Sequence, residues 1–446
     1  MTGISSVAMP QTAVMALGQT PSCIAGIPAL DFPPVLMHNR CVRPISGQRL
    51  VKLLSTAAVM AVGASACDGA AFTTRPLQRQ GKTIGFASDP DGDVNLLIRR
   101  SHREDLPLDG FVIAFDDQPK AWADKEIGQS TRAGVLDDAR TVGAANSIRL
   151  RESFLQWQTG QDPGLGDAQR HEWAVASWRL AGETVTAARL EGLFLDPLPY
   201  VRGTWKTPAA LTPAAARVAA KQRGLDVGRA FYAQAPEAVV VLAVGYSEVF
   251  RQVCLGPSPV SLEDSAYTLY PAFLDGLFAA RDEATARPPI IDAFLPSYIT
   301  RQPEAFQAFR SLMHFRWDDL VASWTPGIQT LDNTDPEDPQ AVTWQAQAPA
   351  LGCSSSQLLE VARDVPAAMS IWLDAPASLS SFATFSATDY SQNWFSPMAA
   401  AAALAAARQA TDNYVFLWST ETPWFPLRGG PTLPKDYLEA LRPSQP

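Results

Sequence analysis

Eight short apolar segments that alternate with helical segments predict an α/β protein, a single (β/α)8 TIM barrel over residues 80–446. The apolar segments are rich in β-branched and aromatic residues, whereas the segments between them are rich in Ala and carry apolar residues at helical spacing. Several apolar segments end at an acid, and the carboxyl ends of parallel barrel strands meet at one rim. Together, these observations predict carboxylates and aromatic rings around the mouth of a barrel.

The expected strands and helices follow one another in βα order along the chain. The expected strands are residues 83–86, 111–115, 146–150, 190–195, 238–244, 289–294, 367–373 and 414–418. The expected helices are residues 94–103, 172–188, 213–233, 266–284, 304–320, 355–363, 397–410 and 437–441. Pro213 lies in the first turn of its helix, where proline is well tolerated. Residues 321–350 are polar and Pro-rich, which predicts a long loop on the rim.

The first 80 residues have the pattern of a targeting segment. Four basic residues between positions 40 and 52 precede an apolar run at 53–62, and small residues then precede Cys67, as in an export signal. We expect residues 1–36 to be an untranslated or disordered extension, 37–66 a signal peptide and 67–80 a linker. Cys67 follows a sequence similar to a bacterial lipobox, which predicts a lipid anchor. A helix of the soluble core is the alternative for this segment.

Export would place the protein in the periplasm, on a membrane as a lipoprotein, or outside the cell. Cleavage before Cys67 would leave only Cys254 and Cys353 besides the lipid-bearing thiol. An oxidising compartment can pair two such thiols. The spacing alone does not bring them together, and two isolated buried thiols are the favoured interpretation.

Composition and missing motifs exclude several classes of protein. The net charge is −9 at pH 7 and the sequence has no basic stripe, which argues against nucleic acid as a partner. The four histidines are not at metal-ligand spacing, so no metal is expected. The sequence contains neither a Gly-rich phosphate loop nor a G-x-S-x-G elbow, so no cofactor is expected either.

The strand-end acids and the aromatic residues beside them form the candidate site. Glycoside hydrolysis requires two carboxyl groups, one to protonate the leaving oxygen and one to act as base or nucleophile. Aromatic rings beside them can stack on sugar faces. The expected catalytic residues are Glu421, Asp196 and Asp292, and the expected substrate-binding residues are Asp116, Tyr200, Trp205, Tyr298, Trp418 and Trp424.

Each candidate also has an ordinary structural alternative. An Asp before Pro at a strand end, such as Asp196, often caps a turn, and Asp292 can accept bonds from neighbouring backbone amides. Tyr200 and Tyr298 can pack beneath loops, as half-buried tyrosines usually do. Glu421 lies between two tryptophans just after the last expected strand, yet a solvated loop acid has the same pattern.

Six segments occur in a defined order along residues 80–430: 84–86, 106–112, 191–200, 223–231, 267–276 and 414–418. In this order they resemble a group of largely uncharacterised bacterial barrel proteins related to glycoside hydrolases. The resemblance implies a barrel that acts on or binds an oligo- or polysaccharide. No single segment is specific, and the resemblance rests on their order.

The chain departs from that group at acidic positions. The group has D-P-E-P-Y where this chain has Leu198 in place of the acid, and a Glu about where Leu295 stands. In the last motif the acid comes one residue later, at Glu421. Leucine neither donates nor accepts a proton, so two hypotheses stay open. One is a hydrolase that uses other acids, Asp116 included, and the other is a non-catalytic carbohydrate-binding barrel. A barrel with unrelated small-molecule chemistry is a third alternative.

Overall fold

The computed structural model describes sixteen stretches of the chain, all after residue 80. The expected extension, signal peptide and linker, all five cysteines and the expected helix at 355–363 lie outside the described residues. The described residues are 81–87, 94–103, 105–115, 118–122, 125–158, 164–197, 205–250, 265–293, 295–301, 303–313, 330–332, 343–345, 365–375, 385–419, 424 and 433–442.

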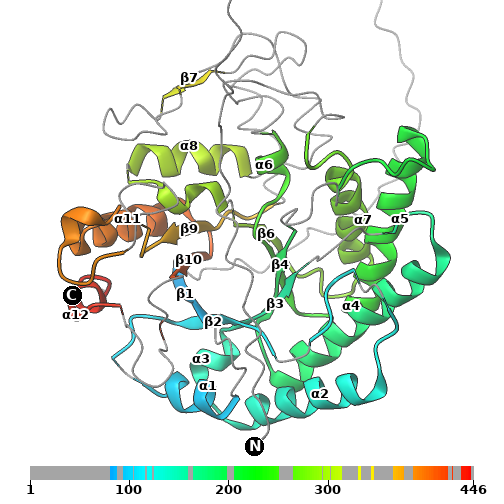
Figure 1. The fold of residues 1–446 in the computed structure, drawn as a ribbon, viewed down its shortest axis with the longest axis horizontal. Helices are drawn as coiled ribbons and strands as arrows, with labels where there is room; N and C mark the ends of the chain where they lie inside the picture. The colour runs from blue at the N-terminus through cyan, green and yellow to red at the C-terminus, as the bar shows by residue number, and fades with distance from the viewer. Residues whose placement is uncertain are drawn as a thin grey trace, which may run out of the picture. The chain divides into compact units, whose positions relative to one another are not determined.

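Eight parallel strands form the central sheet (Figure 1). Each strand pairs in parallel with its neighbour, in the order β6-β5-β4-β3-β2-β1-β10-β9. The strands are β1 (Lys82–Ala87), β2 (Gly110–Ile113), β3 (Phe154–Gln158), β4 (Gly192–Asp196), β5 (Val239–Leu242), β6 (Ile290–Asp292), β9 (Met369–Trp372) and β10 (Tyr414–Trp418).

The sheet closes on itself between β6 and the segment that leads into β9. The backbone N–H of Asp292 donates to the carbonyl of Pro366 (3.0 Å), and the N–H of Ala368 donates to the carbonyl of Asp292 (2.8 Å). This parallel bridge between Asp292 and Ala367 joins the two ends of the strand order. The fold is therefore a single (β/α)8 TIM barrel, which confirms the predicted fold class.

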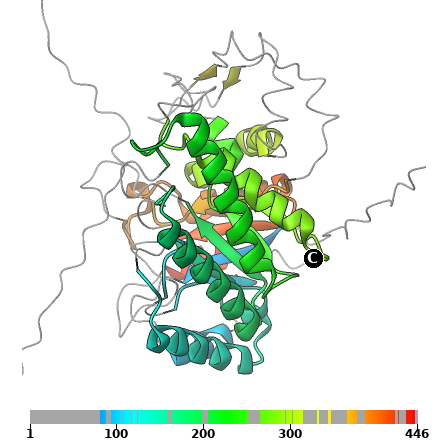
Figure 2. The ribbon, with the colours of Figure 1, turned by 90° about the vertical axis from the view of Figure 1, so that its right-hand side faces the viewer.

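Helices connect the strands and cover the outside of the sheet. Figures 1 and 2 show α4, α5 and α7 side by side along the barrel, and these helices contact one another directly. The longer helices are α1 (Val94–Ser101), α2 (Gln129–Ala144), α4 (Ala168–Ala188), α5 (Pro213–Tyr232), α7 (Tyr270–Glu283), α8 (Pro303–Met313), α11 (Pro397–Ala410) and α12 (Lys435–Ala440). The short helical segments are α3 (Ile148–Arg151), α6 (Tyr246–Phe250), η2 (Leu295–Ile299) and η3 (Tyr390–Gln392).

Local sequence signals start several of these helices. Thr212 precedes α5 and accepts a bond from the N–H of Ala215 (3.3 Å), with Pro213 in the first turn as expected. Asp167 caps α4 by accepting from two backbone amides. Ser396 caps α11 by accepting from the N–H of Ala399 (3.2 Å), with Pro at the start as in α5. These caps satisfy amide donors that a helix end leaves unpaired.

One expected strand is wrong, and one of the longer helices is an addition. Residues 146–150 do not form a strand, because Asn146 has a left-handed backbone (φ 50°) and α3 begins two residues later. The third strand is β3 instead, where outward Leu155 and Trp157 alternate with inward residues that include two glutamines. Helix α2 has no counterpart among the expected helices. Within 321–350, β7 (Thr330–Asp332) and β8 (Thr343–Gln345) pair antiparallel.

Aromatic side chains fill the lumen of the barrel. Phe154 meets Tyr414 edge to face with ring centres 5.1 Å apart, and Phe194 lies 5.0 Å from both Phe86 and Phe416. Smaller side chains from β2, β5 and β6 complete this inner cluster. Large rings in offset or edge contact bury much apolar area without steric conflict. The lumen is therefore a packed core and not a channel.

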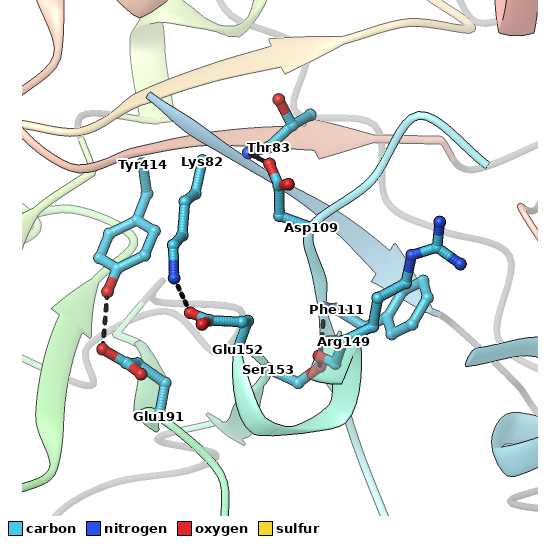
Figure 3. Close-up of polar contacts among 9 residues, drawn as sticks. All are labelled: Lys82, Thr83, Asp109, Phe111, Arg149, Glu152, Ser153, Glu191 and Tyr414. Carbon is cyan, nitrogen blue, oxygen red and sulfur yellow. Dashed lines mark hydrogen bonds and ion pairs between the residues drawn. The ribbon is translucent and has the colours of Figure 1, made fainter. Parts of the chain in front are cut away.

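Polar contacts hold the amino-terminal end of the barrel (Figure 3). The hydroxyl of Tyr414, at the bottom of the lumen, donates to Oε1 of Glu191 (3.1 Å), and Lys82 forms an ion pair with Glu152. These pairs join β1, β10 and the segments that enter β3 and β4. They satisfy polar groups at the end of the barrel where side chains usually serve stability.

A second set of contacts ties the same end to backbone atoms. Oδ2 of Asp109 accepts from the N–H of Thr83 (2.7 Å), and Oγ of Ser153 accepts from the N–H of Phe111 (2.9 Å; Figure 3). The guanidinium of Arg149 donates to backbone carbonyls between residues 101 and 108. These side chains stabilise the connection between β1 and β2.

Two glycines let α5 and α7 approach closely. A Cβ at Gly224 would collide with the carbonyl oxygen of Phe273, and a Cβ at Gly276 would collide with the carbonyl oxygen of Lys221. Each glycine thus faces the backbone of the other helix. Gly134 in α2 is the opposite case, because a Cβ there would meet nothing within 4 Å.

We expect Gly224→Ala to lower the free energy of unfolding by about 1–3 kcal/mol, because the helices must separate to admit the methyl group. Gly134→Ala is the matched control and should raise stability by about 0.5–1 kcal/mol through helix propensity alone. Urea denaturation followed by circular dichroism measures both. Equal changes in the two variants would contradict the close contact of α5 and α7.

Candidate functional site

The carboxyl-terminal mouth of the barrel is lined by aromatic rings. Trp418 and Trp372 are opposite one another in the register of β10 and β9, so their side chains leave the same face of the sheet. Trp418 stacks on Phe86, with ring centres 3.6 Å apart and planes 19° apart, and packs on the lumen cluster. Both tryptophans are half-buried. The top layer of the core is thus the floor of the mouth.

The indole of Trp418 carries an unused donor. In the part of the chain that the structure describes, its Nε1 is buried and has no hydrogen-bond partner. Nε1 of four other buried tryptophans is also unpaired there, so the donor of Trp418 is a candidate ligand contact only because of its place in the mouth.

Asp196 is the carboxylate on the lumen side. It follows Phe194 by two residues on β4, and Phe194 belongs to the lumen cluster, so strand alternation directs Asp196 to the same face. Asp196 lies opposite Gln158 in the register of β3 and is 1% exposed. The half-buried side chains of Gln156 and Gln158 leave this face of β3, so the lumen becomes polar toward its mouth.

Asp374 joins the ends of β9 and β10. Its Oδ1 accepts from Nε1 of Trp372 (2.7 Å), and its Oδ2 accepts from the hydroxyl of Ser419 (3.1 Å). The residue is fully buried. These bonds orient the Trp372 ring. Asp374 directly follows the expected strand at 367–373 but was not an expected site residue, and nothing in the local sequence distinguishes it from the other acids that follow strands.

Tyr298 adds a third ring beside the mouth. It lies on η2, and its ring centre is 5.7 Å from that of Trp372, with planes 37° apart. The side chain is half-buried. We refer to Tyr298, Trp372 and Trp418 as the aromatic wall. The expected site residues Tyr298 and Trp418 belong to it, and Trp372 is an addition.

Asp292 lies on the other face of the sheet. Ile291 packs in the lumen, so the next residue points outward. Its carboxylate accepts from the N–H of Gly245 (3.1 Å) and from both the N–H (3.3 Å) and hydroxyl (2.5 Å) of Ser247. It thereby holds the turn between β5 and α6. This is the structural alternative for Asp292, which is not part of the site that we propose.

The carboxylates of Asp292 and Asp196 both affect the pKa of a buried tyrosine, Tyr270. Burial raises the pKa of the Tyr270 hydroxyl well above its ordinary value, and the charges of Asp292 and Asp196 act in the same direction. The hydroxyl donates to the carbonyl of Val244 (2.7 Å). Tyr270 therefore stays protonated and acts as a donor at the end of β5.

Trp205 and Trp424 pack outside the lumen. Trp205 is 1% exposed, donates from Nε1 to the carbonyl of Pro197 (2.8 Å) and contacts the edge of Trp122. Trp424 is also buried, with Nε1 3.2 Å from the position that a Cβ would take on Gly85. Neither ring has an open face for a sugar, which corrects the expectation that these two residues bind substrate.

The remaining expected site residues lie in parts of the chain that the structure does not describe. Glu421, Asp116 and Tyr200 lie outside the described residues, as does Leu198. In the sequence, Glu421 follows Ser419 by two residues.

Two clefts lie away from the aromatic wall. One, of about 510 Å3, lies beside the Lys82–Glu152 ion pair at the amino-terminal end. The other, of about 700 Å3, lies between α4 and α5. There, burial and the nearby Arg223 guanidinium lower the pKa of His171, whose Nδ1 accepts from Nε of Arg223 (2.8 Å).

Within the described residues, no group of three His, Cys, Asp or Glu is placed to hold a metal ion, and no helix is long and apolar enough to cross a membrane.

Comparisons with known proteins give distant structural likenesses. No family model and no curated protein matches the chain. A protein from Anabaena variabilis assigned as a sugar phosphate isomerase/epimerase is 11% identical, covering 81% of this chain and 96% of its own, with a TM-score of 0.38. A glycoside hydrolase family 5 enzyme from Prevotella bryantii is 11% identical, covering 76% and 97%, with a TM-score of 0.39. A family 5 xyloglucanase from Paenibacillus pabuli, in complex with ligand, is 9% identical, covering 82% and 98%, with a TM-score of 0.38.

We expect Asp292→Ala to lower the free energy of unfolding by about 2–4 kcal/mol, because it leaves buried donors at Gly245 and Ser247 unpaired. Asp137→Ala, at an exposed position of α2, is the matched control and should change stability by less than about 0.5 kcal/mol. Chemical denaturation measures both variants. A stable Asp292→Ala protein would contradict the structural role of this carboxylate.

Proposed function

We propose that this protein is a glycoside hydrolase-like barrel that acts on an oligo- or polysaccharide at its carboxyl-terminal mouth. The observation that carries the proposal is the aromatic wall at the end of the barrel where the strands stop, the end at which Asp196 also closes β4. Barrel enzymes have their active sites at this end. The distant structural likenesses carry no argument for activity, and the proposal rests on the mouth itself.

The chemistry of the mouth suits a sugar. Aromatic faces pack against the C–H faces of sugar rings, and the three rings of the wall come from two strands and η2. Nε1 of Trp418, which has no partner among the described residues, is the hydrogen-bond donor that we assign to a sugar hydroxyl or ring oxygen. The half-buried side chains of Gln156 and Gln158 supply both donors and acceptors.

Cleavage of a glycosidic bond requires two carboxyl groups. We assign one to Asp196, which lies on the lumen face, and the other to Glu421, which follows β10 in the sequence. One protonates the leaving glycosidic oxygen as the bond to the anomeric carbon breaks. The other attacks the anomeric carbon or activates the water that does so. The separation of the two groups decides between retention and inversion.

A non-catalytic carbohydrate-binding barrel is the second candidate function. The observations that favour it are the leucines at positions 198 and 295 and the full engagement of Asp374 by Trp372 and Ser419. Under this alternative the aromatic wall binds sugar while no pair of carboxylates performs chemistry.

Two variants separate binding from catalysis. With a panel of plant and bacterial polysaccharides, Asp196→Asn should lower kcat by about 10²–10⁴, as loss of a general acid or base does, with little change in binding. Trp418→Ala should weaken binding about 30-fold, because a tryptophan anchor commonly contributes about 2 kcal/mol. Trp205→Phe, in the outer core, is the control for both measurements.

The outcomes distinguish the two functions. Binding of a glycan that Trp418→Ala weakens, without hydrolysis by the wild type, establishes the binding protein. Hydrolysis that Asp196→Asn leaves intact removes Asp196 from the mechanism. Absence of both binding and hydrolysis across the panel refutes the proposal as a whole.

We also propose export with a lipid anchor at Cys67, on the basis of the basic, apolar and small-residue pattern before it. The full chain, produced in a bacterium fed radiolabelled palmitate, should carry label in the membrane fraction, and Cys67→Ala should carry none. Cys254→Ala is the control and should keep the label. Unlabelled wild-type protein in the cytosolic fraction would refute both export and anchoring.

A further inference from the structure

The seam between β6 and β9 has an interrupted backbone ladder. The bridge at Asp292 provides backbone bonds to Pro366 and Ala368 only. Beyond it, the chain after β6 turns into η2, while β9 continues to Trp372. In a parallel ladder, alternate residues direct N–H and C=O to the same neighbour. Ser370, two residues after Ala368, therefore faces the position that β6 has left.

The hydroxyl of Ser297 takes the place of the missing strand. The N–H of Ser370 donates to Oγ of Ser297 (2.8 Å), and the same hydroxyl donates to the carbonyl of Ser370 (3.0 Å). The hydroxyl of Ser370 donates to the carbonyl of Ala293 (3.0 Å). Both serines are fully buried. A serine hydroxyl is both donor and acceptor, so it can satisfy both backbone groups at once.

The hydrogen bonds between Ser297 and Ser370 fix the position of η2 on β9. Ser297 directly precedes Tyr298 of the aromatic wall, so its two bonds set where the backbone of Tyr298 lies relative to β9. The far end of η2 is held as well, because Nε1 of Trp394 donates to the carbonyl of Ile299 (2.7 Å). Trp372 is oriented from its other side by Asp374. Tyr298 and Trp372 are thus both held by buried polar contacts.

We propose that Ser297 is a positioning residue, whose hydroxyl replaces the β6–β9 ladder and holds the Tyr298 ring against Trp372 for ligand binding. That Ser297 positions the Tyr298 ring is argued from the contacts of Ser297 alone. That the two rings then bind a carbohydrate rests on the proposed function. A buried hydroxyl with no access to the mouth then affects ligand affinity through the two rings.

The first test needs no ligand. The full chain is labelled with 5-fluorotryptophan, and Trp372→Phe identifies the Trp372 resonance in the 19F NMR spectrum. Ser297→Ala should shift that resonance, as should Tyr298→Leu, which removes the neighbouring ring. If Ser297 acts through Tyr298, the double variant should show the Trp372 shift of Tyr298→Leu alone.

Ser153→Ala is the matched control. Its hydroxyl is also fully buried and also accepts from one backbone N–H while donating to a carbonyl, but at the amino-terminal end of the barrel. It should lower stability and leave the Trp372 resonance in place. If Ser297→Ala gives no folded protein, Ser297→Cys, which offers only a weak donor and acceptor, carries the same comparison.

A second measurement links the positioning to ligand binding. On a polysaccharide that the wild type hydrolyses, Ser297→Ala should raise KM about tenfold with little change in kcat, whereas Ser153→Ala should change neither. For a glycan that is bound without hydrolysis, Kd takes the place of KM.

An unshifted Trp372 resonance in Ser297→Ala, or additive shifts in the double variant, would overturn the positioning role. A shifted resonance with unchanged KM or Kd would show that the rings are positioned but do not serve ligand binding. A shifted resonance in a protein that binds no glycan would instead refute the proposed function and leave the positioning intact.

Discussion

Closure of eight parallel strands around a filled lumen is the constraint on which the rest of this structure depends. A barrel of this size must fill its interior with side chains, and here large rings do so, with Phe86, Phe194 and Phe416 in mutual contact. Trp418 stacks directly on Phe86, so the candidate site is built on the core itself. A change in the packing of the lumen would therefore move the floor of the mouth.

The two ends of the barrel use polar groups for different purposes. At the amino-terminal end, pairs such as Lys82 with Glu152 and Tyr414 with Glu191 join neighbouring segments and leave the charges satisfied. At the carboxyl-terminal end, the polar groups of the mouth surround aromatic rings, and Nε1 of Trp418 has no partner within the described residues. The amino-terminal contacts thus serve stability, whereas a binding role for the mouth belongs to the proposed function.

The barrel and most of its elements could be predicted from the sequence, because apolar runs and Ala-rich helices follow local periodicity. The exceptions were helix α2, which was not expected, and strand β3, because the third strand was expected at residues 146–150 instead. The site was less predictable. Asp196 and Asp292 both end apolar strands before an aromatic segment, yet one faces the lumen and the other holds the turn between β5 and α6. Successive side chains of a strand point to opposite faces of the sheet. Which face each aspartate takes therefore depends on which neighbouring residue packs in the lumen.

The sequence by itself determined the architecture and a pool of acids and rings near the strand ends. Only the tertiary structure decided that Tyr298 and Trp418 share a wall with Trp372, and that Trp205 and Trp424 are buried in the outer core. It also placed the hydroxyl of Ser297 in the seam between β6 and β9. The physical reason is that periodicity is a local property of the chain. The neighbours of a side chain depend instead on how segments far apart in sequence meet when the barrel closes.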